Sequence, residues 1–106
     1  ITDSLISEND AAVSGGGIRN SGELTLIRST VHNITASCFG GCVPDPMEQG
    51  GGIFNRGNEA RLTLTSSLIT ENFANDDGGG VFNEGGTVSQ TDTLIINNDP
   101  NDCVGC

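Results

Sequence analysis

The residues with the most capacity for chemistry are four cysteines in two close pairs, Cys38/Cys42 and Cys103/Cys106. Together they could form a Cys₄ zinc site, because zinc is bound by thiolates at similar spacings. The alternative is two local disulfides, which are typical of small chains in an oxidising compartment. A redox Cys-x-x-Cys motif would need a helix start, and the sequence shows none. We therefore predict disulfides, with Cys38–Cys42 and Cys103–Cys106 favoured among the three pairings that four cysteines allow.

The charged residues do not form a recognisable catalytic set, so we predict that the protein is not an enzyme. Polysaccharide lyases need Arg or Lys beside a carboxylate cluster that holds Ca²⁺. This chain has no Lys, and its four Arg are dispersed. Glycosidases need paired carboxylates on one surface, whereas the carboxylates here lie mostly in expected turns. His32 is the single histidine, which excludes a multi-histidine metal site.

The chain is strongly acidic, with fourteen Asp and Glu against four Arg and a net charge of −10. This balance argues against nucleic-acid partners and anionic membrane surfaces. The apolar runs are only a few residues long, so no membrane span is predicted. Two acidic turns, 75–77 and 99–102, offer oxygen ligands for Ca²⁺, but neither matches a known calcium loop. We expect solvated turns and no cofactor.

These residues are carried by an internal repeat, which is the most informative feature of the sequence. Three segments open with a glycine triplet, continue with a short apolar run and end in a Ser or Thr before a second apolar pair. The glycine-led openings are Gly15-Gly16-Gly17-Ile18-Arg19-Asn20, Gly50-Gly51-Gly52-Ile53-Phe54-Asn55 and Gly78-Gly79-Gly80-Val81-Phe82-Asn83. A partial copy, Ser4–Asn9, stands at the front and matches Ser67–Asn72. Because Ile1 falls inside a repeat, we expect a longer precursor upstream.

The repeat predicts an all-β fold. Three short β-like runs in roughly 25 residues are typical of a three-sided parallel β-helix, a solenoid with equivalent strands one coil apart. We predict three coils plus a partial first coil, as a single domain over residues 1–106 or a fragment of a longer one. The first full repeat is longer than the second, and the excess lies within 37–49, which reads as an inserted loop.

Equivalent residues should then stack in columns along the axis. Branched aliphatic residues fill the predicted inward columns, for example Ile18, Ile53 and Val81. Two columns of Asn lie at turns, where stacked amides can hydrogen-bond to one another and to the backbone. The first holds Asn20, Asn55 and Asn83, and the second holds Asn9, Asn72 and Asn98, with Ile34 interrupting it.

Two outward surfaces are candidates for binding. On the second strand of each coil lie Thr25, Thr63 and Ser89, with Ile27, Thr65 and Thr91 two positions further on. Regular Thr arrays resemble ice-binding faces, but Thr is also simply a good strand former. On the first strand, Arg19, Phe54 and Phe82 should stack outward. Exposed Phe on adjacent coils would indicate a contact surface.

The string Gly-Gly-Gly-Ile-x-Asn, followed by Leu-Thr-Leu and Ser-Thr-Val, resembles bacterial right-handed β-helix proteins. These are related to polymorphic outer membrane proteins and pectate-lyase-like surface proteins. The segment Asn101–Gly105 is similar to the Asp-Cys-x-Gly element that often follows the last coil in such chains. The resemblance covers nearly the whole chain except 38–48, and it implies a right-handed solenoid that is secreted or displayed at the cell surface. Ile34 and Gln90 depart from the pattern.

From these features we predict a non-catalytic, extracellular structural or adhesive element, with a filament subunit as a specific version. Its partner would be protein, either further copies or further coils of the same chain. The alternatives are a carbohydrate-binding or carbohydrate-active β-helix and, third, an ice-binding Thr face.

Overall fold

The strands are short and pair in parallel throughout the part of the chain that the structure describes. The computed structural model describes residues 1–11, 16–36, 50–75 and 77–106. Over these residues the protein is all-β, and no helix is present that could cross a membrane. The strands hold two to five residues each, because aliphatic and Thr-rich runs alternate with Gly, Asn, Asp and Ser turns.

The described strands form four parallel sheets, which we label A to D. Sheet A holds β4 (Glu23–Ile27), β8 (Arg61–Thr65) and β12 (Thr87–Thr91). Sheet B holds β1 (Leu5–Ser7), β5 (Thr30–His32), β9 (Leu68–Thr70) and β13 (Leu94–Ile96). Sheet C holds β2 (Asp10–Ala11), β6 (Thr35–Ala36) and β10 (Phe73–Ala74). Sheet D holds β3 (Ile18–Asn20), β7 (Ile53–Arg56), β11 (Val81–Glu84) and β14 (Cys103–Val104).

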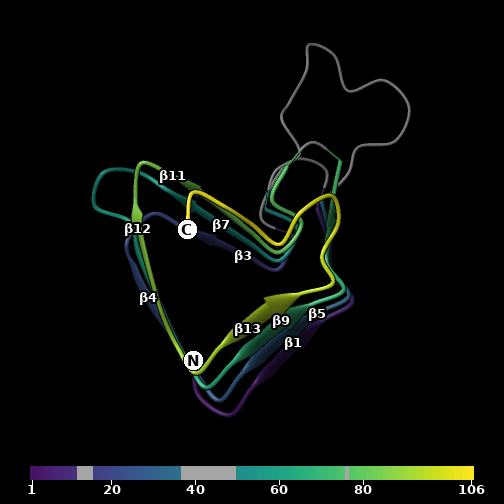
Figure 1. Ribbon diagram of the computed structural model, residues 1–106, viewed down its shortest axis with the longest axis horizontal. Helices are drawn as coiled ribbons and strands as arrows, with labels where there is room; N and C mark the ends of the chain where they lie inside the picture. Colours follow the sequence, from purple (N-terminus) through teal and green to yellow (C-terminus); the bar gives the residue numbers. More distant parts are fainter. Residues whose placement is uncertain (12–15, 37–49, 76) are drawn as a thin grey trace.

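The chain visits sheets B, C, D and A in turn, and then begins the next circuit. Each strand pairs with its equivalent one circuit away, as in the pairing of Ile18 with Ile53 and of Ile53 with Val81. Viewed along the stack, sheets A, B and D form the sides of a triangular outline (Figure 1). The sequence predicted three strands per repeat. The structure adds a fourth strand to the repeat, the two-residue strand of sheet C, which the sequence pattern did not predict. The predicted inserted loop, 37–49, lies outside the described residues.

Inward-facing side chains of the repeats form one apolar core. Its buried members, in chain order, are Leu26, Val31, Ile34, Ile53, Leu62, Leu64, Ile69 and Val81. Partly buried apolar residues pack against this cluster from the first and last circuits: Ile6, Ile18, Leu24, Val88, Ile95 and Cys103. The predicted inward columns are confirmed by the strand register. At the inward position next to Leu64, Gln90 is exposed, so the last strand of sheet A closes the core poorly.

Two corners of each circuit are made by a non-glycine residue with positive φ. Asp3, Arg28, Ser66 and Asp92 have φ between 47° and 50°, and Glu8, Asn33, Glu71 and Asn97 have φ between 54° and 57°. This left-handed conformation costs roughly 1–2 kcal/mol for a residue with a Cβ. It persists only where the surrounding structure holds it.

At the first corner, the holding group is a ladder of hydroxyls. The residues after the corner are Ser4, Ser29, Ser67 and Thr93. The backbone N–H of Ser29 donates to Oγ of Ser67, and the N–H of Ser67 donates to Oγ1 of Thr93. The hydroxyl of Ser67 donates in turn to the carbonyl of Thr65, two residues back. Each hydroxyl therefore ties its own corner together and joins it to the neighbouring circuit.

The last glycine of each triplet allows the circuits to approach closely where sheet D begins. A Cβ on Gly52 would lie 2.7 Å from the carbonyl oxygen of Gly80, one circuit away. Since the clashing atom is backbone, it cannot rotate aside. The backbone N–H of Gly52 donates to the carbonyl of Gly79, so the close approach also forms a hydrogen bond.

The chain end closes one corner of the last circuit. Oδ1 of Asp102 accepts the backbone N–H of Asn98 at 2.9 Å and the side-chain Nδ2 of Asn98 at 3.2 Å. Asp102 therefore takes the place that a further Asn would occupy above Asn98. β14 then pairs with β11, while β12 and β13 keep one open edge each.

Candidate functional site

The first predicted Asn column forms a continuous ladder at the corner between sheets D and A. Nδ2 of Asn20 donates to Oδ1 of Asn55 at 2.8 Å, and Nδ2 of Asn55 donates to Oδ1 of Asn83 at 2.7 Å. The side chain of Asn83 continues to the carbonyl of Gly105 at 2.9 Å. Asn55 is fully buried. These amides are used in holding the circuits together.

The second Asn column is shorter than the first. Nδ2 of Asn72 donates to Oδ1 of Asn98 at 3.0 Å, and both side chains are buried. Ile34 takes the next position and is buried in the core, while its backbone N–H still donates to Oδ1 of Asn72 at 3.0 Å. Asn9, beyond Ile34, is exposed. The interruption expected at Ile34 thus separates Asn9 from the two buried amides.

Of the four cysteines, two lie within the described residues. Cys103 and Cys106 are joined by a disulfide, with Cα atoms 6.0 Å apart, which lies in the range typical of disulfides. Cys103 is half-buried against the core, and the bond ties it to the exposed chain end. The predicted Cys38–Cys42 pair lies outside the described residues.

We predicted that Arg19, Phe54 and Phe82 form an exposed column, and this prediction is wrong for Phe54. Its ring stacks on Phe82 with centroids 5.7 Å apart and planes inclined by 6°. The guanidinium carbon of Arg19 lies 5.5 Å from the Phe54 centroid on a neighbouring strand. Because strand register stacks this column on both sides of Phe54, its side chain is only 3% exposed. Phe82 is half-buried and Arg19 is exposed. The column contributes stacking and cation–π attraction between strands.

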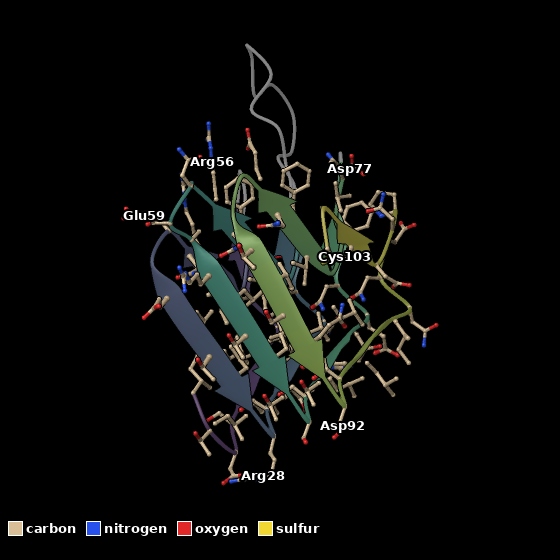
Figure 2. The ribbon with its side chains drawn as sticks, turned by 60° about the vertical axis from the view of Figure 1, so that its left-hand side comes forward. Arg28, Arg56, Glu59, Asp77, Asp92 and Cys103 are labelled. Atoms are coloured by element: carbon tan, nitrogen blue, oxygen red, sulfur yellow. A yellow bond between two sulfur atoms is a disulfide. The ribbon has the colours of Figure 1, made fainter. Side chains whose placement is uncertain are left out.

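The outer face of sheet A presents the predicted hydroxyl-bearing residues in register. Thr25, Thr63 and Ser89 form one exposed column. The neighbouring column holds Ile27, Thr65 and Thr91, and the column at the strand starts holds Glu23, Arg61 and Thr87. The three long strands that carry these columns face the viewer in Figure 2. The face is therefore ordered and rich in hydroxyls, but apolar at Ile27 and charged at one edge.

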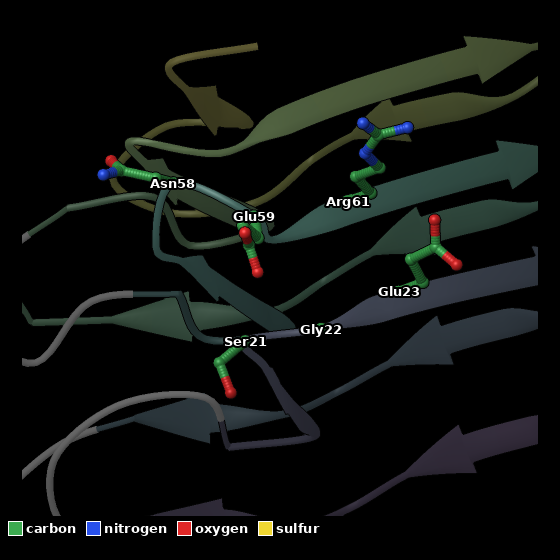
Figure 3. Close-up of a pocket in the computed structure, with 6 residues that line it drawn as sticks. All are labelled: Ser21, Gly22, Glu23, Asn58, Glu59 and Arg61. Atoms are coloured by element: carbon green, nitrogen blue, oxygen red, sulfur yellow. The ribbon is translucent and has the colours of Figure 1, made fainter.

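A hollow of about 440 Å³ opens at the charged edge of this face (Figure 3). It is lined by the β3–β4 turn and the β7–β8 turn, with Ser21, Gly22, Glu23, Asn58, Glu59 and Arg61. The cause is a difference in turn length. Asn20 and Glu23 are three positions apart, whereas their register partners Asn55 and Arg61 are six positions apart. The longer turn projects beyond the shorter one.

The hollow combines two carboxylates, one guanidinium, one amide and one hydroxyl. In the described part of the chain, arginine ion pairs are formed by Arg28 with Asp3 and by Arg56 with Glu84, not by Arg61. The guanidinium of Arg61 is therefore available as a donor, beside carboxylates that accept hydrogen bonds. Such a set suits a ligand with several hydroxyl groups. The repeat pattern did not predict this hollow, because Glu23 and Glu59 lie in different repeats. The longer turn was its only signal.

An exposed ion pair between Arg28 and Asp3 shifts the pKa of both side chains. Nε of Arg28 donates to Oδ1 of Asp3 at 2.7 Å, and Nη2 of Arg28 donates to Oδ2 at 3.0 Å. These hydrogen bonds hold the pKa of the Asp3 carboxyl below its usual range and raise the pKa of Arg28. On sheet B, Nε2 of His32 lies 2.5 Å from Oε2 of Glu71. Both pairs join neighbouring circuits and are exposed to solvent.

Asp77 and Asp102, one from each acidic turn, use their carboxylates within the fold. Oδ1 of Asp77 accepts a hydrogen bond from Nδ2 of Asn101 at 2.6 Å, and Asp102 caps Asn98. Over residues 1–11, 16–36, 50–75 and 77–106, no cluster of three His, Cys, Asp or Glu is arranged to hold a metal ion.

Comparison of the chain with protein-family models, with curated proteins and with solved structures found no match. The family resemblance stated from the repeat motifs therefore stays a prediction.

Proposed function

We propose that this chain is a right-handed parallel β-solenoid and serves as a non-catalytic, extracellular structural or adhesive element. The observation that carries the proposal is the state of its core at the two axial ends. Ile6, Ile18 and Leu24 in the first circuit are only partly buried, and so are Val88, Ile95 and Cys103 in the last. Between them the core residues are fully buried.

This pattern favours an element that continues into other polypeptide. A half-buried aliphatic side chain still exposes apolar surface to water, and covering that surface is favourable. β12 and β13 also leave backbone donors and acceptors unpaired along one edge each. In solenoids each coil contacts only its neighbours, so stability grows as coils are added.

The use of the polar residues points the same way. The buried Asn and Ser side chains form hydrogen bonds with neighbouring circuits, so these polar groups are used by the fold itself. A secreted or surface location fits the disulfide at Cys103–Cys106, because such bonds persist in oxidising compartments.

Incubation with acidic and neutral polysaccharides tests the non-catalytic role. We expect no release of reducing or unsaturated ends from any of them. Cleavage that is lost in Glu59→Gln or Arg61→Ala, with folding retained, would overturn the proposal and make the hollow an active site.

A second candidate function is saccharide binding without cleavage, favoured by the hollow beside the hydroxyl-bearing face of sheet A. A glycan array with the purified chain tests it. Retention of a glycan that weakens in Arg61→Ala, but not in Arg56→Ala, would support this function. An ice-binding face is less well supported, because Ile27 interrupts one hydroxyl-bearing column and the charged residues Glu23 and Arg61 border the other. We therefore do not propose it.

A further inference from the structure

The two ends of sheet B carry the same kind of residue at the same place in the repeat. Leu5 pairs with Thr30, Thr30 with Leu68, and Leu68 with Leu94. Leu5 and Leu94 therefore stand at the two ends of one outward column. Among the residues that the structure describes, they are also the most exposed large hydrophobic ones, at 66% and 58%. If the column continued by one circuit into a second copy, Leu5 of that copy would lie against Leu94.

We propose that a second copy of this chain stacks head to tail on the first, with β13 of one copy pairing in parallel with β1 of the next. This inference rests on the proposed structural role and names the partner. Outward Leu94 would lie against Leu5 of the second copy. Inward Ile95 would lie against Ile6 of the second copy, so both half-buried core residues become covered.

The hydrogen-bond pattern of this column extends across such an interface. Within the chain, the N–H of Ser4 donates to Oγ of Ser29, and the same step repeats from Ser29 to Ser67 and from Ser67 to Thr93. By that rule, the N–H of Thr93 would donate to Oγ of Ser4 in the second copy. In the other direction, the N–H of Leu94 donates to the carbonyl of Ser67, and the N–H of Thr30 donates to that of Ser4. The N–H of Leu5 in the second copy would correspondingly donate to the carbonyl of Thr93.

A second copy fits these ends because donor, acceptor and apolar positions match by repeat register. The contact uses a different surface on each partner, so it is heterologous and can extend into a filament. The chain end covers sheet C through the Asp99 bridge to Phe73, the corner after β13 through Asp102, and sheet D through β14. β12 and β13 remain accessible.

Charge sets the conditions for assembly. Asp92 and Asp3 are corner residues of the same column, so stacking would bring Asp92 against Asp3 of the second copy. Two carboxylates repel, and each copy carries a net charge of −10. Stacking should therefore strengthen as salt is raised, since salt screens exposed charges. Asp92→Asn should strengthen it at low salt, whereas Glu59→Gln, which removes the same charge from an exposed turn away from β1 and β13, should have less effect.

Cysteine cross-linking tests the register. The double variant Leu5→Cys/Leu94→Cys, purified at high concentration in 0.5 M NaCl and oxidised, should give a ladder of disulfide-linked oligomers on a non-reducing gel. Leu68→Cys/Leu94→Cys is the matched control, because these neighbours lie in one chain and should cross-link within the monomer. Each single variant alone should give no ladder, whereas an equimolar mixture of the two single variants should give dimers.

Sedimentation velocity gives the second readout. We expect the mean mass to rise with concentration, and Leu94→Lys to weaken association by at least about tenfold, since it places an ammonium on an apolar contact. Thermal unfolding of each variant checks that the chain remains folded. A monodisperse monomer under these conditions, together with an intrachain cross-link in the control, would overturn the stacking. That result would leave the structural role standing, which fails instead if polysaccharide cleavage is found.

Discussion

Oγ of Ser67 accepts the backbone N–H of Ser29 at 3.1 Å while its own hydrogen goes to the carbonyl of Thr65 at 2.8 Å. One small side chain thus stabilises a left-handed corner at Ser66 and joins two circuits of the chain. The same arrangement repeats at Ser29 and Thr93. Side-chain hydroxyls therefore hold the corners at Arg28, Ser66 and Asp92, where no glycine is present.

Removing this hydroxyl should weaken the fold measurably. Ser67→Ala leaves the N–H of Ser29 and the carbonyl of Thr65 without their partner, and we expect a loss of about 1–3 kcal/mol in the free energy of unfolding. Ser67→Thr should cost much less, because Thr occupies the equivalent position at Thr93. Chemical denaturation of both variants checks this. Equal losses in the two would contradict the ladder.

The buried Asn ladder should be more sensitive than any exposed Asn. Asn55→Leu keeps the approximate size of the side chain but removes both ladder hydrogen bonds, so Asn20 and Asn83 lose a partner. We expect a loss of about 2–4 kcal/mol, since buried unpaired amides carry their full desolvation penalty. Exposed Asn58→Ala is the control and should change stability by less than about 0.5 kcal/mol. Urea unfolding of the two variants measures the contrast.

Two glycines should respond to alanine in opposite directions. Gly52→Ala would push a Cβ to within 2.7 Å of the Gly80 carbonyl oxygen, and overpacking of this kind costs about 1–3 kcal/mol. At Gly22 nothing lies within 4 Å of an added Cβ, and Gly22→Ala should stabilise the fold by about 0.4–1 kcal/mol, because alanine restricts the unfolded chain. Thermal unfolding distinguishes the two. A destabilised Gly22→Ala would show that this turn needs a glycine for another reason.

The Asp3–Arg28 pair predicts a pH dependence with a definite sign. Because hydrogen bonds from Arg28 lower the pKa of Asp3 in the folded state, the pair stabilises the protein above the unfolded pKa of Asp3, which is ordinarily near 3.8. That contribution is lost as the pH falls through the lower, folded pKa. The stability difference between the native chain and Arg28→Gln should therefore be present at pH 6 and vanish in strong acid. Carboxyl NMR titration should show the pKa of Asp3 rising in Arg28→Gln.

The terminal disulfide should contribute only modestly. Cys103 and Cys106 are three positions apart, and closing so short a loop stabilises a fold by about 2 kcal/mol at most in the chain-entropy description. We expect Cys106→Ser to loosen β14 while the core circuits remain folded. Hydrogen exchange should show faster exchange at Val104 and little change at Leu64. Peptide mass spectrometry of the unreduced native chain should recover the Cys103–Cys106 link, and free thiols at both positions would contradict it.

Much of the fold could be predicted because the repeat places like residues one circuit apart. The register of Asn20 with Asn55, and of Leu24 with Leu62, follows directly from aligning the repeats. Parallel pairing then follows, since equivalent runs stack in the same direction. The break at Ile34 was also visible, because an apolar residue stands where the other repeats have Asn.

The parts that could not be predicted depend on corners and on neighbours across circuits. Sheet C has strands of two residues, too short to leave a periodic signal. The positive φ values at Arg28 and Glu71 are unexpected for these residue types, and only the hydroxyl and amide groups that follow them explain the conformation. Phe54 looked exposed because its position faces outward, but stacking between Arg19 and Phe82 buries it.

The bonds from one Asn side chain to the next all run in one sense. Nδ2 of Asn20 donates toward Asn55, Asn55 toward Asn83, and Asn72 toward Asn98, always from the earlier circuit to the later one. Aligned amide dipoles polarise one another, so each bond strengthens the next. Each Asn ladder therefore has a donor end and an acceptor end, although the backbone hydrogen bonds between circuits run both ways. In the stacking proposed above, a copy added at one end would meet a different set of polar groups from a copy added at the other end.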